Sequence, residues 1–395
     1  MTIKAAFAGI LGLTATGNDH SGSLSGTVDS PPALIWARDL PGARVSAASH
    51  TELGTPLIVG DEILVGSAGS NALYSLNRRS GTLEHQYGAA GPVQAAPVVA
   101  GERIIFTDAA GYTWCYRKGA EKEEWKHYGG APVMSSPTVT SDAVYISNVG
   151  SAVYALGIED GALLWRHLQE EDLQRSSRME LYGAPSPMVA GNLVLAGFHD
   201  GSLVALTQDT GERQWQRRVG EGRYPDLLGA PLLAGADVIV AGFSEPLMSL
   251  NMDTRNVRWR VDAGGTSAPV LDRDWVVHGG TDGKLRSVDR LTGAPKWMWE
   301  SPSGGSLTRP VVTDAGIFVG SSTDGLYLID EDSGEEIWMF EPGYTLSGIS
   351  ANVAVEGRQL VAVTNAGRVL SLVVPAPSAD WAKDVGVLPL GGERE

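Results

Sequence analysis

The segment from Pro187 to Trp215, PMVAGNLVLAGFHDGSLVALTQDTGERQW, is one complete unit of a repeat that recurs along the chain. Its apolar residues form short runs, and each run ends at Gly191, at Asp200-Gly201 or at Thr210-Gly211. Short strands joined by tight turns have this pattern, and glycine accepts the positive φ that hairpin turns require. We therefore predict three linked strands followed by a fourth strand that carries Trp215.

The repeat can be counted from the distance between an opening proline and a closing tryptophan. Six units share a spacing of 28 positions: Pro97 to Trp125, Pro137 to Trp165, Pro187 to Trp215, Pro231 to Trp259, Pro269 to Trp297 and Pro310 to Trp338. Pro56 opens a seventh unit, in which His85 stands near the tryptophan position. An eighth unit starts near Ala351, but Pro375 and Pro377 occur where its fourth strand is due. Proline lacks the donor that a strand ladder needs, so this strand is not expected there.

The missing strand is present at the other end of the chain. Leu34 to Arg38 reads as a fourth strand with its tryptophan, Trp36, and no three strands precede it. Four-stranded repeats of about 40 residues are typical of β-propellers, which avoid exposed ends by closing into a ring. We predict an all-β fold, an eight-bladed β-propeller of four-stranded antiparallel blades closed by the N-terminal strand. Trp381 could supply the last strand instead, although two prolines precede it.

The tryptophans occur at one fixed register, which favours packing over ligand stacking. Each is expected to dock on the neighbouring blade near its Thr-Gly turn and to bury about 200 Å². The predicted docking residues are Trp36, Trp125, Trp165, Trp215, Trp259, Trp297 and Trp338.

The N-terminal residues differ from the repeats. Lys4 precedes an apolar run from Ala5 to Leu13, and small residues follow, which predicts a secretory signal peptide over residues 1–17. A frayed terminus and a signal anchor are the alternatives, but nine apolar residues are too few to cross a bilayer of about 30 Å. We expect a flexible tether over 18–33, the propeller over 34–374, a tail over 375–395, and a periplasmic location.

Composition restricts the possible partners. The 395 residues carry a formal net charge of −16, which argues against binding to nucleic acid, because phosphate contacts require clustered Lys and Arg. Outside the N-terminal run, no stretch of the chain stays apolar for 18 residues, so no integral membrane span is expected. The single cysteine, Cys115, lies in an apolar run and is interpreted as a core residue.

The sequence contains no recognisable catalytic, cofactor or metal motif. The seven histidines include no His-x-x-x-His pair, and no calcium loop, Gly-x-Ser-x-Gly elbow or phosphate loop occurs. His199-Asp200-Gly201 is better explained as a hairpin turn than as a catalytic dyad. We therefore assign no catalytic, cofactor-binding or metal-binding residue.

The repeat resembles a known family. The pattern Ala-Leu-x-x-x-Thr-Gly-x-x-x-Trp, from Ala205-Leu206 to Trp215, is similar to the pyrroloquinoline-quinone (PQQ) type propeller repeat, and the resemblance covers roughly Leu34 to Val374. Within that superfamily, the size and the order of the long loops resemble the BamB family of outer-membrane barrel assembly factors. Members of that family are lipoproteins, whereas Asn18 stands here in place of the lipid-bearing cysteine. The quinone dehydrogenases of the superfamily carry adjacent cysteines, which this chain lacks.

The links between units vary in length, and variable loops on a constant scaffold often carry binding function. The two links that follow Trp165 and Trp215 contain six candidate partner-binding residues: Met179, Leu181, Tyr182, Arg223, Asp226 and Leu228. The resemblance implies that these links contact the barrel subunit, with a family leucine at Leu181, a family aspartate at Asp226, and Tyr182 in place of a family arginine. Alternatively, the same residues fold back as plugs over the blades.

The resulting prediction is a non-catalytic scaffold, a monomer within a larger complex, that resembles BamB and binds an outer-membrane barrel-assembly subunit or another envelope protein. The first alternative is a propeller that binds PQQ or another small molecule and has oxidoreductase activity. The second is an interaction module of a different envelope complex.

Overall fold

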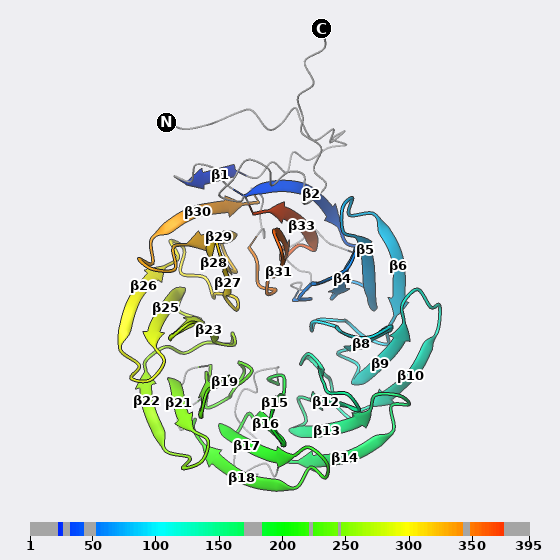
Figure 1. Ribbon diagram of the computed structural model, residues 1–395. Helices are drawn as coiled ribbons and strands as arrows, with labels where there is room; N and C mark the ends of the chain where they lie inside the picture. Colours follow the sequence, from blue (N-terminus) through cyan, green and yellow to red (C-terminus); the bar gives the residue numbers. More distant parts are fainter. Residues whose placement is uncertain are drawn as a thin grey trace.

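The computed structural model describes residues 23–26, 32–42, 53–169, 184–220, 224–243, 246–342 and 348–374. Within these ranges all regular structure is β, and eight antiparallel sheets are arranged in a ring (Figure 1). The predicted eight-bladed propeller is confirmed.

Each blade is a four-stranded meander. Blade 1 comprises β3 (Leu57–Val59), β4 (Glu62–Ser67), β5 (Ala72–Asn77) and β6 (Leu83–Gly88), and blade 2 comprises β7 (Val98–Ala100), β8 (Arg103–Thr107), β9 (Tyr112–Arg117) and β10 (Glu123–Tyr128). Blade 3 comprises β11 (Thr138–Val139), β12 (Ala143–Ser147), β13 (Ala152–Gly157) and β14 (Leu163–Leu168), and blade 4 comprises β15 (Met188–Ala190), β16 (Leu193–Gly197), β17 (Ser202–Thr207) and β18 (Arg213–Arg218). Blade 5 comprises β19 (Leu232–Ala234), β20 (Asp237–Val240), β21 (Leu247–Asn251) and β22 (Val257–Val261). Blade 6 comprises β23 (Val270–Asp272), β24 (Trp275–Gly279), β25 (Lys284–Asp289) and β26 (Pro295–Glu300). Blade 7 comprises β27 (Val311–Thr313), β28 (Gly316–Gly320), β29 (Leu326–Ile329) and β30 (Glu336–Glu341). Blade 8 comprises β31 (Ala354–Glu356), β32 (Gln359–Val363), β33 (Arg368–Val373) and the N-terminal β2 (Ala33–Asp39).

The ring closes where β2 pairs with β33, from Ala33 opposite Val373 to Asp39 opposite Arg368. This pairing confirms the closure predicted from the register of Trp36, and β2 holds the position that Trp381 would otherwise have filled. Trp381 lies outside the described residues.

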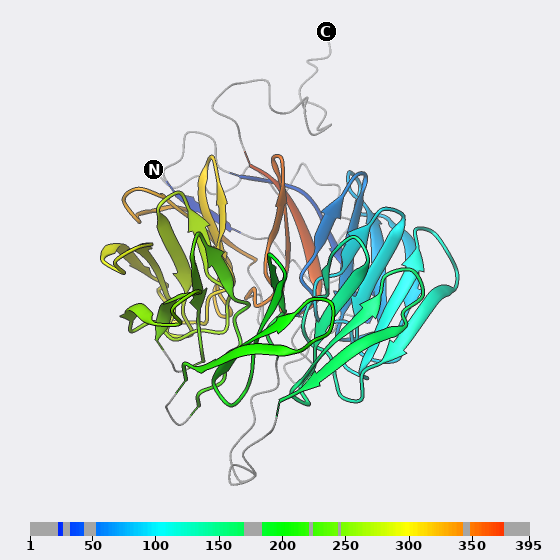
Figure 2. The same ribbon diagram turned by 60° about the horizontal axis from the view of Figure 1, so that its bottom comes forward.

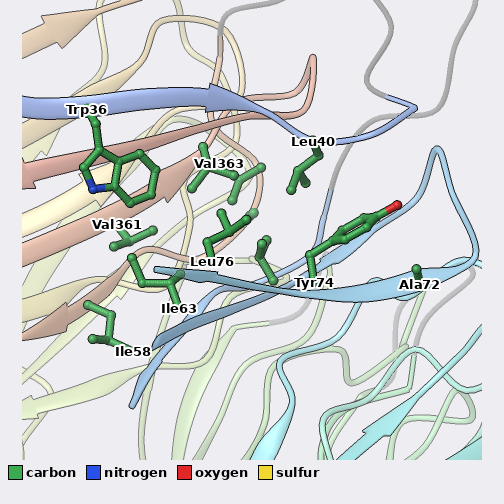
Figure 3. Packing of buried hydrophobic residues seen from close by; sticks show 12 residues of the cluster. Trp36, Leu40, Ile58, Ile63, Ala72, Tyr74, Leu76, Val361 and Val363 are labelled. Atoms are coloured by element: carbon green, nitrogen blue, oxygen red, sulfur yellow. The ribbon is translucent and has the colours of Figure 1, made fainter. Parts of the chain in front are cut away.

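The seam between blades 8 and 1 has an apolar core and a polar clamp. Figure 3 shows Trp36 and Val361 of blade 8 packed towards Ile63 of blade 1. Beside this core, the Trp36 indole N–H donates to the Arg78 carbonyl oxygen at 3.0 Å, and the Arg78 guanidinium donates to the Gln359 Oε1 at 2.6 Å. Side chains from both chain ends and from blade 1 therefore hold the seam.

The blades present two different rims (Figures 1 and 2). One rim carries the turns between the third and fourth strands, and we call it the docking rim. The other rim carries the turns between the second and third strands together with the links between blades, and we call it the linking rim. Backbone bonds join these links to the turns beside them, for example from Ala109 to Pro92 at 2.9 Å and from Ser322 to Ser306 at 2.9 Å.

Blade 7 has a fifth strand. β1 (Ser23–Gly26) pairs antiparallel with β30, and Gly26 lies opposite Trp338. The strand lies within residues 18–33, for which the sequence predicted a flexible tether. The four residues Ser-Leu-Ser-Gly contain a single apolar residue, Leu24, so the sequence gives no apolar alternation from which this strand could have been predicted.

Candidate functional site

The candidate site lies on the linking rim, where blades 4 and 5 meet. The second-to-third turn of blade 4 presents His199, and the link that follows β18 supplies Asp226. The His199 Nδ1 lies 3.0 Å from the Asp226 Oδ1, and Asp226 is only 6% exposed. The aspartate therefore fastens the link to the rim, and His199 uses Asp226 as its partner instead of the adjacent Asp200.

Backbone contacts hold the same link on both sides. The Leu227 N–H donates to the Phe198 carbonyl at 3.3 Å, and the Phe243 N–H donates to the Asp226 carbonyl at 2.9 Å. Leu227 also forms an isolated bridge with Gly242, and its side chain is buried. Segment 225–227 thus lies folded back between blades 4 and 5.

An aromatic pair stands at the outer end of this folded segment. Tyr224 is half-buried, and its ring meets that of Phe243 edge to face, with the centroids 6.2 Å apart. Tyr224 therefore leaves part of its surface accessible next to the anchored aspartate.

The neighbouring turn of blade 4 is joined to the end of blade 3. The Asp200 carboxylate accepts hydrogen bonds from the Gln169 side chain and from the Ser202 hydroxyl, both at 3.0 Å. Burial lowers the pKa of His167, which faces Phe198 at 6.3 Å between ring centroids. Hydrogen bonds to Asp200 thus join the two blades at this part of the linking rim. His167 beside them is uncharged at neutral pH.

The six predicted partner-binding residues have different positions. Met179, Leu181, Tyr182 and Arg223 lie outside the described residues. Asp226 is a buried anchor, and Leu228 is half-buried three positions before Pro231. Asp226 was predicted to contact a partner, whereas its side chain is buried and contacts His199.

Sequence reasoning missed two exposed apolar residues on the linking rim. Tyr128 ends β10 with 56% of its surface exposed, and Leu168 ends β14 with 59% exposed. Leu168 immediately precedes the longest link of the propeller. Its signal in the sequence was an apolar residue three positions after Trp165, where other outer strands carry polar residues such as Arg218.

The tryptophans lie on the docking rim. Five of them donate their indole N–H to a carbonyl in the third-to-fourth turn of the next blade: Trp36 to Arg78 (3.0 Å), Trp125 to Ile158 (3.1 Å), Trp165 to Gln208 (2.6 Å), Trp259 to Arg290 (2.9 Å) and Trp297 to Glu331 (2.8 Å). His85 makes the corresponding contact with the Ala120 carbonyl at 3.0 Å. The fixed register therefore has a packing role at these positions.

Two tryptophans differ, each for a visible reason. Trp215 is only half-buried, and Arg255 stands at φ +62° in the turn it faces, where the other turns have glycine. Trp338 is fully buried, but its indole nitrogen has no hydrogen-bond partner among the described residues. In blade 8 the fourth strand comes from the other end of the chain, so no third-to-fourth turn exists to offer a carbonyl.

Two observations on the described residues concern thiol and metal chemistry. Burial raises the pKa of the Cys115 thiol to about 12, so this thiol stays protonated and unreactive at neutral pH. Across the described ranges, no group of three His, Cys, Asp or Glu side chains is placed to hold a metal ion. In the same part of the chain, no helix has the length and apolar character needed to cross a membrane.

A cavity of about 400 Å³ lies on the docking rim between blades 6 and 7. Asp272, Asp314 and Glu331 line it, and the Arg273 guanidinium already bonds to Asp272 and Glu331. Three carboxylates and one guanidinium thus line this cavity, which lies on the opposite rim from the candidate site.

Comparison with protein families identifies the relatives of this chain. The family model described as outer membrane protein assembly factor BamB matches residues 110–298 and 281–387. The chain belongs to the BamB family. BamB from Burkholderia pseudomallei is 27% identical over 257 residues, covering 63% of this chain and 65% of that protein. BamB from Escherichia coli is 25% identical over 285 residues, covering 61% of this chain and 72% of that protein. The match to BamB from Legionella pneumophila, at 25% identity, spans 49% of this chain and 52% of the relative. The chain thus spans between about half and three quarters of these relatives.

Solved structures agree on the fold. The crystal structure of BamB from Moraxella catarrhalis superposes with a TM-score of 0.73 at 19% identity and covers 87% of this chain and 99% of that chain. A quinohemoprotein alcohol dehydrogenase from Pseudomonas putida gives a TM-score of 0.65 at 15% identity, with 88% and 78% covered. At such identities these likenesses concern the propeller architecture and not the activity.

Proposed function

We propose that this BamB-family propeller is a non-catalytic scaffold for outer-membrane β-barrel assembly. The match of the BamB family model between residues 110 and 387 carries the proposal. The chain would work in the periplasm, bound to the outer membrane through a barrel-assembly subunit.

The linking rim of blades 3 to 5 is the proposed contact surface. Its apolar components are Leu168 and Tyr224, and the contact between the buried Asp226 and the half-buried His199 anchors the second link. Apolar anchors on a rigid polar support are typical of interaction hot spots, which are worth about 2 kcal/mol or more each. Met179, Leu181, Tyr182 and Arg223 remain proposed contact residues of the same surface.

A pull-down with the tagged full chain from envelope extract tests this proposal. We expect the barrel-assembly subunit to be recovered with the wild type and to be lost with Leu168→Asp or Leu181→Asp. Leu291→Asp is the matched control, because Leu291 is 51% exposed on the opposite, docking rim. Equal recovery with all three variants would contradict the assignment of the linking rim.

The oxidoreductase alternative is tested separately. Incubation with pyrroloquinoline quinone and calcium should leave no quinone absorbance on the purified protein. Retained absorbance with substrate-dependent dye reduction would replace the scaffold proposal by the enzymatic one.

A further inference from the structure

The fourth strands of blades 3, 4 and 5 carry a concentration of positive charge. β14, β18 and β22 follow one another along the outside of the ring (Figure 1), and each is the last strand of its sheet. All three lack aspartate and glutamate, and together they contain six arginines, all exposed: Arg166, Arg213, Arg217, Arg218, Arg258 and Arg260. We call the surface that these strands form the basic wall.

Neighbouring carboxylates do not balance this charge. Arg258 pairs with the buried Asp237 at 2.8 Å, whereas the other five arginines form no ion pair with any described residue. On blade 2, by contrast, Arg117 pairs with Glu124 at 2.6 Å. Each of the five other fourth strands also contains at least one aspartate or glutamate. The basic wall is therefore a local excess of positive charge on a chain whose formal net charge is −16.

Apolar side chains lie among these arginines. Leu163 and Leu164 on β14 are 50% and 54% exposed. Trp215 on β18 lies between Arg213 and Arg217 along the strand and is only half-buried. Arginine together with exposed leucine and tryptophan is the composition of protein surfaces that contact a membrane interface, where the charges meet the headgroups and the apolar groups enter the boundary layer.

The charge distribution also selects one orientation towards an anionic surface. A chain with a net charge of −16 is repelled by such a surface unless a face with an excess of arginine approaches it. Asp209, Glu212 and Asp253 lie in the docking-rim turns of blades 4 and 5, so the positive charge belongs to the wall and not to this rim. Charges on distant faces contribute little, because salt at 0.1 M screens them over about 10 Å.

We propose that the basic wall docks on an anionic phospholipid surface. A guanidinium donates two parallel hydrogen bonds to a phosphate group, and a cluster of about four to eight basic residues at a membrane surface binds anionic lipids. An acidic protein would fit the charge alone, but Leu163, Leu164 and Trp215 among the arginines favour the lipid. This inference goes beyond the scaffold proposal, because it concerns a direct contact between the propeller and lipid.

Flotation of the full chain with vesicles tests the proposal. We expect binding to vesicles of phosphatidylethanolamine and phosphatidylglycerol, little binding to vesicles of phosphatidylcholine alone, and a loss of binding as salt is added. Arg217→Gln combined with Arg260→Gln should weaken binding about tenfold or more, since each arginine at a charged membrane contributes a factor of about five. Neither side chain bonds to a described residue, so the melting temperature should not change.

A second double variant is the matched control. Arg79→Gln combined with Arg117→Gln removes the same charge from exposed positions on blades 1 and 2 and should bind like the wild type. Both double variants keep the N-terminal residues of the wild type, so any difference between them reports the propeller surface.

Hydrogen exchange of the vesicle-bound wild type needs no variant. Amides of β14, β18 and β22 should gain protection on anionic vesicles, and amides of β6 and β10 should not. The proposal is overturned if the wild type does not bind anionic vesicles at low salt, or if both double variants bind equally. Binding to polyglutamate but not to vesicles would also overturn it, because the occupant would then be an acidic protein. Since the vesicles contain no protein, such a failure would leave the proposed contact with a barrel-assembly subunit intact.

Discussion

Removal of the Trp36 side chain should weaken the whole ring, because this indole closes the seam between the two ends of the chain. Trp36 is 4% exposed, and its N–H bonds to the Arg78 carbonyl at 3.0 Å. Truncation of a buried tryptophan to alanine costs about 3–5 kcal/mol, and loss of the hydrogen bond adds about 1 kcal/mol. Trp36→Ala should therefore lower the free energy of unfolding by about 4 kcal/mol or more, a large share of the roughly 5–15 kcal/mol that stabilises a typical domain.

Urea unfolding, followed by circular dichroism, measures this effect as a shift of the midpoint. Trp215→Ala is the matched control, because Trp215 is only half-buried and its indole has no hydrogen-bond partner among the described residues. We expect the control to cost about 2 kcal/mol or less, since less apolar area returns to water. If Trp36→Ala costs no more than Trp215→Ala, the seam does not hold the ring together and the reasoning is refuted.

Three further predictions follow from individual residues. Gly211→Ala should destabilise the fold by about 2 kcal/mol or more, because Gly211 has a φ of +69° and a new Cβ there would lie 2.4 Å from the docked indole of the preceding blade. Gly191→Ala is the control: a Cβ there meets open space, so this change should cost only the strain of the left-handed backbone, about 1 kcal/mol. Thermal melts compare the two variants. Arg255→Gly should stabilise the protein by about 1 kcal/mol, because glycine adopts the positive φ of this turn without strain. The indole of Trp215 should also become more buried, which a blue shift of its fluorescence would report. A loss of stability would contradict the explanation that Arg255 strains the turn. His278 is fully buried, and burial lowers its pKa to about 4, so the unfolded state binds a proton at this residue before the folded state does as the pH falls below about 6.5. Protonation of His278 in the unfolded state should therefore lower the free energy of unfolding by about 2 kcal/mol between pH 7 and pH 5. His278→Leu should flatten that part of the curve of stability against pH.

Much of the propeller could be predicted because each blade repeats the same physical requirements. The proline and tryptophan positions fix the strand order, and the unmatched strand at Trp36 indicated how the ring closes. The regular register also explains why the exceptions are informative. Arg255 replaces a turn glycine, and Trp338 lacks a turn because blade 8 joins two chain ends.

Contacts between residues that follow no regular spacing in the sequence could not be predicted. Asp226 read as a surface residue of a polar link, because its partner His199 is 27 positions away in another turn. β1 contains a single apolar residue, Leu24, and so has no alternating side-chain pattern that would predict a strand.

Photo-crosslinking in living cells tests the scaffold proposal most directly. A photoreactive amino acid is placed at Leu168 on the linking rim or at Leu291 on the docking rim, two leucines of similar exposure, and the adducts are identified by mass spectrometry. The proposal predicts an adduct with a barrel-assembly subunit of the outer membrane from position 168 and none from position 291. Equal adducts from both positions, or no adduct with any outer-membrane assembly protein from position 168, would contradict it.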